Sequence, residues 1–474
     1  MKNLFRAPII CFFLYVLASC VITLNAQIVW TGGALDNNWA TAGNWMGGMV
    51  PGPTDDVEIL LVGAQVIITT GTNAVARKVT IAEASLTIQV MANLTIDGIG
   101  STSHAFLIEE SEIINDGLIS ITNANQDAIN MFNTSSFTNN GTIEISNSNG
   151  DGLELESSTP GSSFINNGTL ILENDGDEGI DLGQNAFFRN SITGIIHIEN
   201  DEEEAIHLDN TGAQFINEGE IYIYSAGEEG IELDSGASFI NARTGYIFIS
   251  NIALDGGTHN AIEIDGATFI NDGTIEIQGG DGIERGVDLD EVENMPGIFT
   301  NNGYITIENV EGEGIYIRGT ASLFTNNLLI NVGLNSSSED IALIRVNASL
   351  INSECGVINM TSPDSISVEF NGIITNEGVF TTVYTGEHNI EGIFTNNGEI
   401  ATPDGNFNLA MGSNPLMGTG SVTMGAIPRQ PSNACLGIPI PALGIWAIAS
   451  LALLFLIVGR IMIKKLSSVR IASS

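Results

Sequence analysis

The sequence has very little positive charge. It holds 56 acidic residues and only 14 lysines and arginines, for a formal net charge of −42 at pH 7. No lysine occurs between Lys78 and Lys464. A surface of this sign repels a phosphate backbone, so the composition excludes nucleic acid as a partner. The acidity does not predict disorder, because 43% of the residues are hydrophobic and they recur regularly through the acidic stretch.

Arginine and cysteine are scarce as well. Between Lys78 and the C-terminal apolar run, positive charge is limited to Arg189, Arg243, Arg285, Arg318, Arg345 and Arg429. The chain has four cysteines, two of them within its first 20 residues. The other two, Cys355 and Cys435, are too far apart in sequence to be assigned as a pair, although an exported compartment permits a disulfide.

Residues 1–26 predict export. Lys2 and Arg6 precede an apolar run, and the closing sequence LNA favours cleavage of a signal peptide after Ala26. The sequence LASC offers an alternative, a bacterial lipobox in which Cys20 would carry the lipid. Cleavage after Ala26 is favoured because the residues that follow Cys20 continue the apolar run and do not form a polar tether.

The C-terminal end predicts a membrane segment. Residues 442–463 contain an apolar run that approaches the ~20 residues needed to span a bilayer core. The basic residues of the tail, 464–474, place the C-terminus in the cytoplasm. Residues 425–441 contain several prolines and are expected to form a linker.

This end of the chain also resembles a sorting signal. Pro439, Pro441, Leu443 and Trp446, followed by the basic tail, are similar to the IPTL-CTERM signal of Gram-negative surface proteins. The resemblance implies delivery to the outer surface of the cell envelope, with the segment held in the inner membrane until a processing peptidase removes it. The alternative is a permanent membrane anchor.

A repeat occupies most of the remaining sequence. Its unit is Phe-x-Asn-x-Gly, then alternating apolar residues, an acidic turn and Gly-Ile-x-Leu. The leading asparagines are Asn115, Asn139, Asn166, Asn190, Asn217, Asn241, Asn271, Asn301, Asn326, Asn352, Asn376 and Asn396. A large apolar residue lies two positions before each, and in most copies it is phenylalanine.

The alternation within each unit predicts short strands with one buried face. Three such strands and three turns per ~25 residues predict an all-β fold, a right-handed parallel β-helix over residues 57–424, in which each strand pairs with its copy one coil away. Stacked coils would bring the phenylalanines into one buried column. The asparagines are expected to adopt left-handed geometry and to form an amide ladder, with the following glycine as a second permissive turn position.

Residues 27–56 are expected to cap the first coil, because a solenoid exposes an unpaired edge at each end. Trp30, Trp39 and Trp45, with the asparagines and acids between them, resemble the start of the passenger regions of β-helical surface proteins and autotransporter adhesins. The alternative is an unrelated small core.

The acidic turns predict a carboxylate stripe along the stacked coils, and calcium accepts several such oxygens in flexible geometry. The candidate ligands are Asp175, Asp177, Glu178, Asp201, Glu202, Glu228 and Glu229. The alternative is a solvated acidic face that prevents aggregation, since no turn has the spacing of a fixed calcium loop. A second metal site, at the neighbouring His197 and His207, is not favoured. No other cofactor is expected.

The sequence favours a structural or adhesive rod over an enzyme, with a surface glycan or protein as its partner. The acids are mostly copies of one another, so we expect alike and solvated environments, whereas a glycosidase needs carboxylates of unlike environment. We also expect no pair of arginines on equivalent strands of adjacent coils. The alternative is a polysaccharide lyase or glycoside hydrolase on a pectate-lyase-like β-helix. Its site would lie in the irregular insertion 279–293, which contains Asp281, Glu284, Arg285, Asp288 and Asp290.

Overall fold

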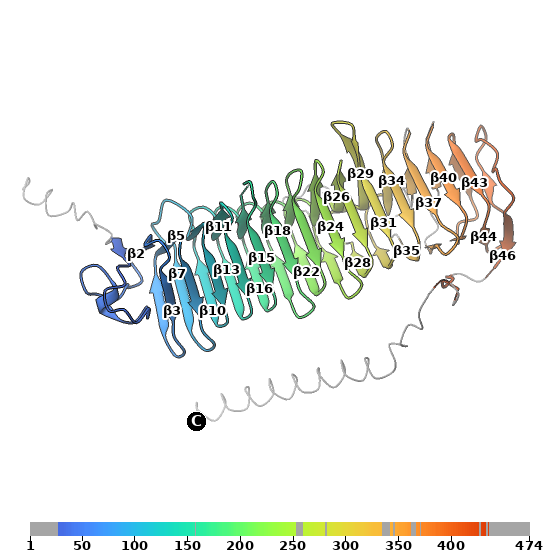
Figure 1. The fold of residues 1–474 in the computed structure, drawn as a ribbon. Coiled ribbons are helices and arrows are strands. Elements are labelled where there is room, and N and C mark those ends of the chain that lie inside the picture. The colour runs from blue at the N-terminus through green and yellow to red at the C-terminus, as the bar shows by residue number, and fades with distance from the viewer. Residues whose placement is uncertain are drawn as a thin grey trace, which may run out of the picture. The chain divides into compact units, whose positions relative to one another are not determined.

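The computed structural model confirms an all-β, right-handed parallel β-helix of about 15 coils (Figure 1). It describes residues 27–156, 158–252, 259–279, 282–333, 342–344, 347–361, 366–369, 371–425, 428–432 and 435. The predicted signal peptide, sorting motif, transmembrane helix and basic tail lie outside these residues. Within them, no helix is long and apolar enough to cross a membrane. The chain divides into two units, residues 1–429 and 430–474, and every strand belongs to the first.

Three sheets run along the β-helix, and the chain visits them in turn. Sheet 1 contains 17 strands. They are β1 (Gln27–Val29), β2 (Asp56–Ile59), β5 (Lys78–Ala82), β8 (Phe106–Glu109), β11 (Ile129–Phe132), β14 (Leu153–Leu155), β17 (Ile180–Leu182), β20 (Ile206–Leu208), β23 (Ile231–Asp234), β26 (His259–Asp265), β29 (Ile283–Val292), β30 (Met295–Pro296), β33 (Ile315–Ile317), β36 (Ala342–Ile344), β39 (Ile366–Val368), β42 (Glu387–Ile390) and β45 (Asn408–Leu409).

Sheet 2 contains 14 strands. They are β3 (Gln65–Ile68), β6 (Ser85–Ile88), β9 (Glu112–Asn115), β12 (Ser136–Asn139), β15 (Ser163–Asn166), β18 (Phe187–Asn190), β21 (Gln214–Asn217), β24 (Ser238–Asn241), β27 (Thr268–Asn271), β31 (Ile298–Asn301), β34 (Leu323–Asn326), β37 (Ser349–Asn352), β40 (Ile373–Asn376) and β43 (Ile393–Asn396).

Sheet 3 contains 15 strands. They are β4 (Asn73–Ala76), β7 (Asn93–Asp97), β10 (Leu118–Thr122), β13 (Thr142–Ser146), β16 (Thr169–Glu173), β19 (Ile195–Glu199), β22 (Glu220–Ser225), β25 (Tyr246–Ser250), β28 (Thr274–Gln278), β32 (Tyr304–Glu308), β35 (Leu329–Gly333), β38 (Val357–Met360), β41 (Val379–Thr382), β44 (Glu399–Thr402) and β46 (Ser421–Met424). Strands pair in parallel with their copies, and the hairpin of β29 with β30 is antiparallel.

A column of phenylalanines from sheet 2 fills the core between the three sheets, as predicted. From Phe137 to Phe324 each ring stacks on the next, with ring centroids 4.6 to 5.0 Å apart. These side chains are fully buried and together remove a large apolar area from water.

The predicted asparagine ladder is also present. From Asn115 to Asn396, the side-chain Nδ2 of each asparagine donates to Oδ1 of the next at 2.7 to 2.9 Å. The glycine that follows is required for close stacking. At Gly141, an added Cβ would lie 2.1 Å from the carbonyl oxygen of Gly117.

The predicted left-handed geometry of the ladder asparagines is wrong. Each ladder asparagine is the last residue of a sheet 2 strand and has extended backbone. Left-handed asparagines lie one turn later, directly after sheet 3 strands, as at Asn147 (φ 59°) and Asn174 (φ 60°), and others lie between sheet 1 and sheet 2 strands, as at Asn133 (φ 50°). A sharp change of direction that needs positive φ therefore precedes the acidic turn.

Residues before the first full coil pack around the tryptophans. The ring centroids of Trp30 and Trp39 each lie 4.8 Å from Trp45 in edge-to-face geometry, and Trp45 Nε1 donates to the carbonyl of Trp39 at 2.7 Å. The 3-10 helix η1 (Ala42–Asn44) lies between Trp39 and Trp45 in sequence. The described cysteines, Cys355 and Cys435, are both disulfide-bonded.

Candidate cation-binding face

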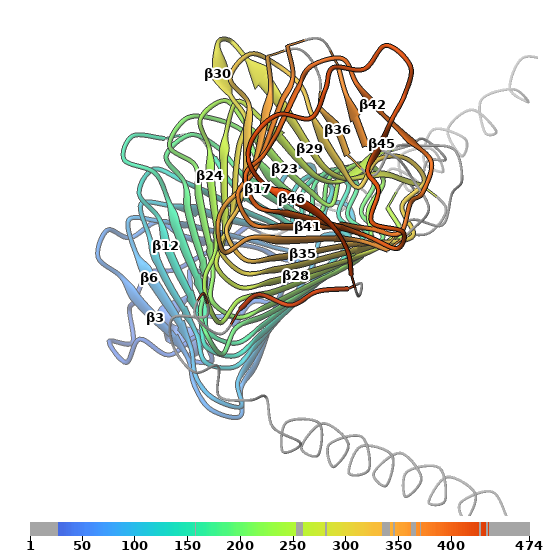
Figure 2. The same cartoon turned by 90° about the vertical axis from the view of Figure 1, so that its right-hand side faces the viewer.

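Three columns of polar side chains run along the side of sheet 1 that faces away from the core. Figure 2 labels three of the strands concerned, β17, β23 and β29. We call these columns the acidic face. Column one comes from the turn before each strand, or from the start of the strand in β26 and β29, and contains Asp127, Asp151, Glu178, Glu204, Glu229, Asn260, Arg285 and Glu313. Column two lies in register within the strands and contains Asn130, Glu154, Asp181, His207, Glu232, Glu263, Asp288 and Tyr316. Column three contains Glu156, Asp209, Asp234, Asp265, Asp290 and Arg318.

The expectation that these acids are alike and solvated is wrong. Asp127 and Asp151 are 8% and 7% exposed, and Asp288 is fully buried. The reason is that column one lies beside column two, so side chains from neighbouring coils cover one another. Crowding like charges away from water disfavours the ionised form.

The pKa values follow this burial. Burial, together with neighbouring Glu178 and Asp127, raises the pKa of Asp151 to about 11. Burial and a hydrogen bond with Asp127 raise the pKa of Glu154 to about 9. Asp127 itself is also buried, but hydrogen bonds from His104 and neighbouring side chains lower its pKa to about 2. Equivalent positions in adjacent coils thus have very different affinities for a proton.

His207 lies within the middle of the acidic face. Its Nδ1 is 3.5 Å from a Glu178 oxygen and 3.4 Å from an Asp181 oxygen, and its Nε2 is 3.6 Å from an Asp234 oxygen. Burial lowers the pKa of His207, but these carboxylates raise it to about 11 overall. The imidazolium therefore acts as a built-in cation for this cluster.

Two arginines from adjacent coils, Arg285 and Arg318, occupy the acidic face further along. Arg285 Nη1 and Arg318 Nη2 lie 3.4 and 3.6 Å from the same oxygen of Asp288. The guanidinium carbons of Arg285 and Arg318 lie 4.3 and 5.7 Å from the ring centroid of Tyr316. Burial raises the pKa of Asp288 and that of Asp265 to about 7. Asp281, from the same predicted insertion, lies outside the described residues.

The seven predicted calcium ligands separate into distinct environments. Glu178 and Glu229 lie in column one, and Asp177, Glu202 and Glu228 lie in the turns beside it. Glu178 clusters with Glu204 and His207, and Glu228 with Glu229 and His259, as groups able to hold a metal ion.

Asp175 and Asp201 instead point into the core and are fully buried in adjacent coils. The backbone N–H of Asp175 donates to Asp201 Oδ1, and Ser148 Oγ donates to Asp175 Oδ1. Burial raises the pKa of both carboxyl groups, that of Asp175 to about 7.

Sequence reasoning missed the column-one acids Asp127 and Asp151. Their signal was available, because each lies three residues before an outward strand position, a constant offset across the repeat. The predicted proximity of His197 and His207 is wrong, since His197 lies on sheet 3 and His207 on sheet 1.

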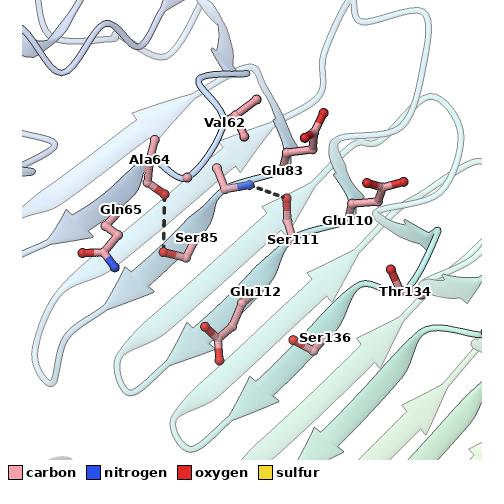
Figure 3. Close-up of a pocket in the computed structure, with 12 residues that line it drawn as sticks. Val62, Ala64, Gln65, Glu83, Ser85, Glu110, Ser111, Glu112, Thr134 and Ser136 are labelled. Atoms are coloured by element: carbon pink, nitrogen blue, oxygen red, sulfur yellow. Dashed lines mark hydrogen bonds between the residues drawn. The ribbon is translucent and has the colours of Figure 1, made fainter.

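An open groove of about 560 Å³ lies at the N-terminal coils, between sheets 1 and 2 (Figure 3). Glu83, Glu110 and Glu112 line it, and Ser111 Oγ accepts a hydrogen bond from the backbone of Ala84 at 3.2 Å. Its lining has no arginine, lysine or histidine, so it offers acceptors without a cationic group.

An aromatic cluster projects from the outer face of sheet 3. We call His197, Tyr222, Tyr224, Tyr246 and Phe248 the aromatic patch. The rings of His197 and Tyr222 stack with centroids 5.0 Å apart, and Tyr224 lies parallel to both. Carboxylates border the patch. Tyr222 Oη donates to Glu220 at 2.7 Å and Tyr246 Oη to Glu276 at 2.9 Å.

Regular coils, an internal ladder and polar outer faces define a parallel β-solenoid domain of the pectate-lyase type. Residues 63–356 match the family model of the BigA third pectate lyase-like domain, over more than half of the sequence. The chain belongs to this family, a domain of bacterial surface proteins. No curated protein and no solved structure matches it.

Proposed function

We propose that the chain is a rod on the bacterial surface with an adhesive, non-catalytic role. The aromatic patch carries this proposal. Tyrosines are enriched at the centres of interfaces because they bury a large area and also form hydrogen bonds. Elsewhere on the outer face of sheet 3 the outward residues are mainly serine, threonine and glutamate, as in β10 and β13.

A β-bulge supports a functional role for Tyr224. The pairing of β19 with β22 runs from Ile198–Ile223 to Glu199–Ser225, which leaves Tyr224 as the extra residue. Bulges re-aim side chains and are over-represented beside functional sites. Tyr224 is the most exposed ring of the patch, at 38%.

The test uses the purified chain on arrays of glycans and of surface proteins. We expect saturable binding that a Tyr224→Ser, Phe248→Ser double variant loses. Tyr304→Ser is the matched control, because Tyr304 also points outward from sheet 3 but lies two coils beyond Tyr246. Binding that survives the double variant, or that Tyr304→Ser removes equally, would contradict an adhesive patch.

The arginine cluster favours a second candidate, a polysaccharide lyase or glycoside hydrolase. Asp265 and Asp288, with pKa values of about 7, lie beside Arg285 and Arg318. Carboxyl groups with pKa values near neutral pH suit general acid or base roles. Assays for reducing ends and unsaturated products on pectate, alginate and polygalacturonate would decide. Turnover that Arg285→Ala abolishes would replace the adhesive proposal.

Surface delivery forms part of the proposal. The C-terminal resemblance to a sorting signal and the N-terminal signal sequence support transport across the inner membrane, with a peptidase as the processing partner. The BigA-like family match supports a surface or exported location.

A further inference from the structure

We infer that Asp127, Asn130, Asp151 and Glu154 form a binding site for one divalent cation that prefers oxygen ligands. This inference is independent of the adhesive role. The site would lie near the N-terminal end of the acidic face, where β11 and β14 and the turns before them come together. None of these four residues was among the calcium ligands predicted from the sequence.

The three carboxylates converge from adjacent coils. One oxygen from each of Asp127, Asp151 and Glu154 lies within 4.8 Å of the others. Backbone amides orient two of them. The N–H of Asp151 donates to Asp127 Oδ1, and the N–H of Glu178 donates to Asp151 Oδ1, both at 3.3 Å. The other oxygen of Asp127, Oδ2, lies 2.6 Å from His104 Nδ1 and 3.0 Å from Asn130 Nδ2 on the side of the cluster.

Asn130 adds a buried amide to this cluster, and its Nδ2 faces three carboxylates, whereas the buried amide of Asn260 further along the acidic face donates to Glu263 alone. Its side chain is fully buried, and its Nδ2 lies 3.0 Å from Asp127 Oδ2, 2.5 Å from Glu154 Oε2 and 3.0 Å from Glu156 Oε1. An amide nitrogen has two hydrogens and cannot satisfy three acceptors. Its Oδ1 is buried without a donor among the described residues. A cation among the carboxylates would supply the positive charge that this cluster lacks. If the side-chain amide of Asn130 were rotated by half a turn, so that Oδ1 and Nδ2 exchange places, Oδ1 would become a further ligand.

The neighbouring clusters already contain a cation. His207 serves one, and Arg285 with Arg318 serves another. In this cluster His104 reaches only Asp127, at 2.6 Å, and Asp151 and Glu154 have no ion pair within the described part of the chain. The raised pKa values of these two acids express the same lack of positive charge.

The donor set defines the class of ion. All the donors are carboxylate or amide oxygens, which Ca²⁺ accepts six to eight at a time in flexible geometry with water completing the shell. A soft metal would require sulfur or imidazole ligands, and the only nearby imidazole is already paired with Asp127.

The first experiment is calorimetric titration of the full chain, stripped with chelator, with CaCl₂ at pH 7.5 and physiological ionic strength. We expect one saturable site in the wild type and at least a tenfold loss of affinity in Asp151→Asn and Glu154→Gln. Glu144→Gln is the matched control, since it removes the same charge from an exposed position on sheet 3. Absence of a saturable site, or an equal loss in Glu144→Gln, would overturn the inference in favour of diffuse charge screening.

The Asn130→Asp variant tests whether Asn130 is a ligand of the cation or only a hydrogen-bond donor to its neighbours. A fourth carboxylate should retain or strengthen Ca²⁺ binding, and it should lower the melting temperature in chelator but not in Ca²⁺. If Asn130 serves only to donate hydrogen bonds to its neighbours, the variant will be less stable in both conditions and will not bind the ion. That result would overturn the inference even if the Asp151 variant failed to fold.

Discussion

The side chain of Asn241 donates to Asn271 Oδ1 at 2.8 Å although 30 residues separate them, whereas Asn217 and Asn241, only 24 residues apart, make the same bond at the same distance. The additional residues are absorbed between the strands and leave the register of β24 with β27 unbroken. Loop length therefore varies at little cost while the ladder stays fixed.

Replacing a ladder asparagine should be costly. Asn217→Ala removes the donor to the buried Asn241 Oδ1 and leaves Asn190 Nδ2 with only its longer bonds to backbone carbonyls, at 3.2 Å. We expect a loss of about 2–4 kcal/mol, measured by urea denaturation. Asn167→Ala breaks a similar bond, to Asn140, on the exposed surface and should have a much smaller effect. Equal losses would show that the buried ladder contributes no more than surface pairing.

The phenylalanine column should contribute more still. Phe239→Ala opens a cavity between two stacked rings and should cost about 3–5 kcal/mol, with Phe239→Leu intermediate. Phe248→Ala, on the outer face of sheet 3, provides the comparison and should change stability by less than about 1 kcal/mol. A similar loss in both variants would argue against a core organised around this column.

Stability without metal should fall as the pH rises. The pKa values of Asp151, Glu154 and Asp288 are raised to about 11, 9 and 7, above the unfolded values near 4, so these acids stabilise the fold while protonated and lose that contribution as pH rises through those values. The raised pKa of His207 acts in the same direction. In chelator, the melting temperature should be higher at pH 5 than at pH 8. The opposite slope would mean that the acidic face is fully ionised and solvated.

Processing can be read from the mass of protein released from cells. We expect the mature chain to begin at Gln27 and to lack the segment after about Leu436. A mass that corresponds to a lipidated Cys20 would favour the alternative start. Retention of Lys464 would favour a permanent anchor over a removed sorting signal.

The sequence predicted the coil, the phenylalanine column and the asparagine ladder. These features depend on the spacing of apolar residues within one repeat and on one residue type that recurs at the same position of every repeat. The sequence did not predict the acidic face correctly. The burial of Asp151 and Asp288 arises when a turn from one coil lies beside the strand of another, which no single repeat displays. The proximity of Arg285 and Arg318 was missed for a related reason, since they occupy different columns and meet through Asp288 and Tyr316 of the column between them.

The most direct test of the adhesive rod is attachment by intact bacteria that display the chain, with surface amounts equalised by antibody labelling. The account predicts that Tyr224→Ser with Phe248→Ser lowers attachment at least tenfold while Tyr304→Ser leaves it unchanged. The melting temperature of the double variant should stay close to that of the wild type, because these side chains lie on the outer face of sheet 3. Unchanged attachment by the double variant at equal display would contradict the account.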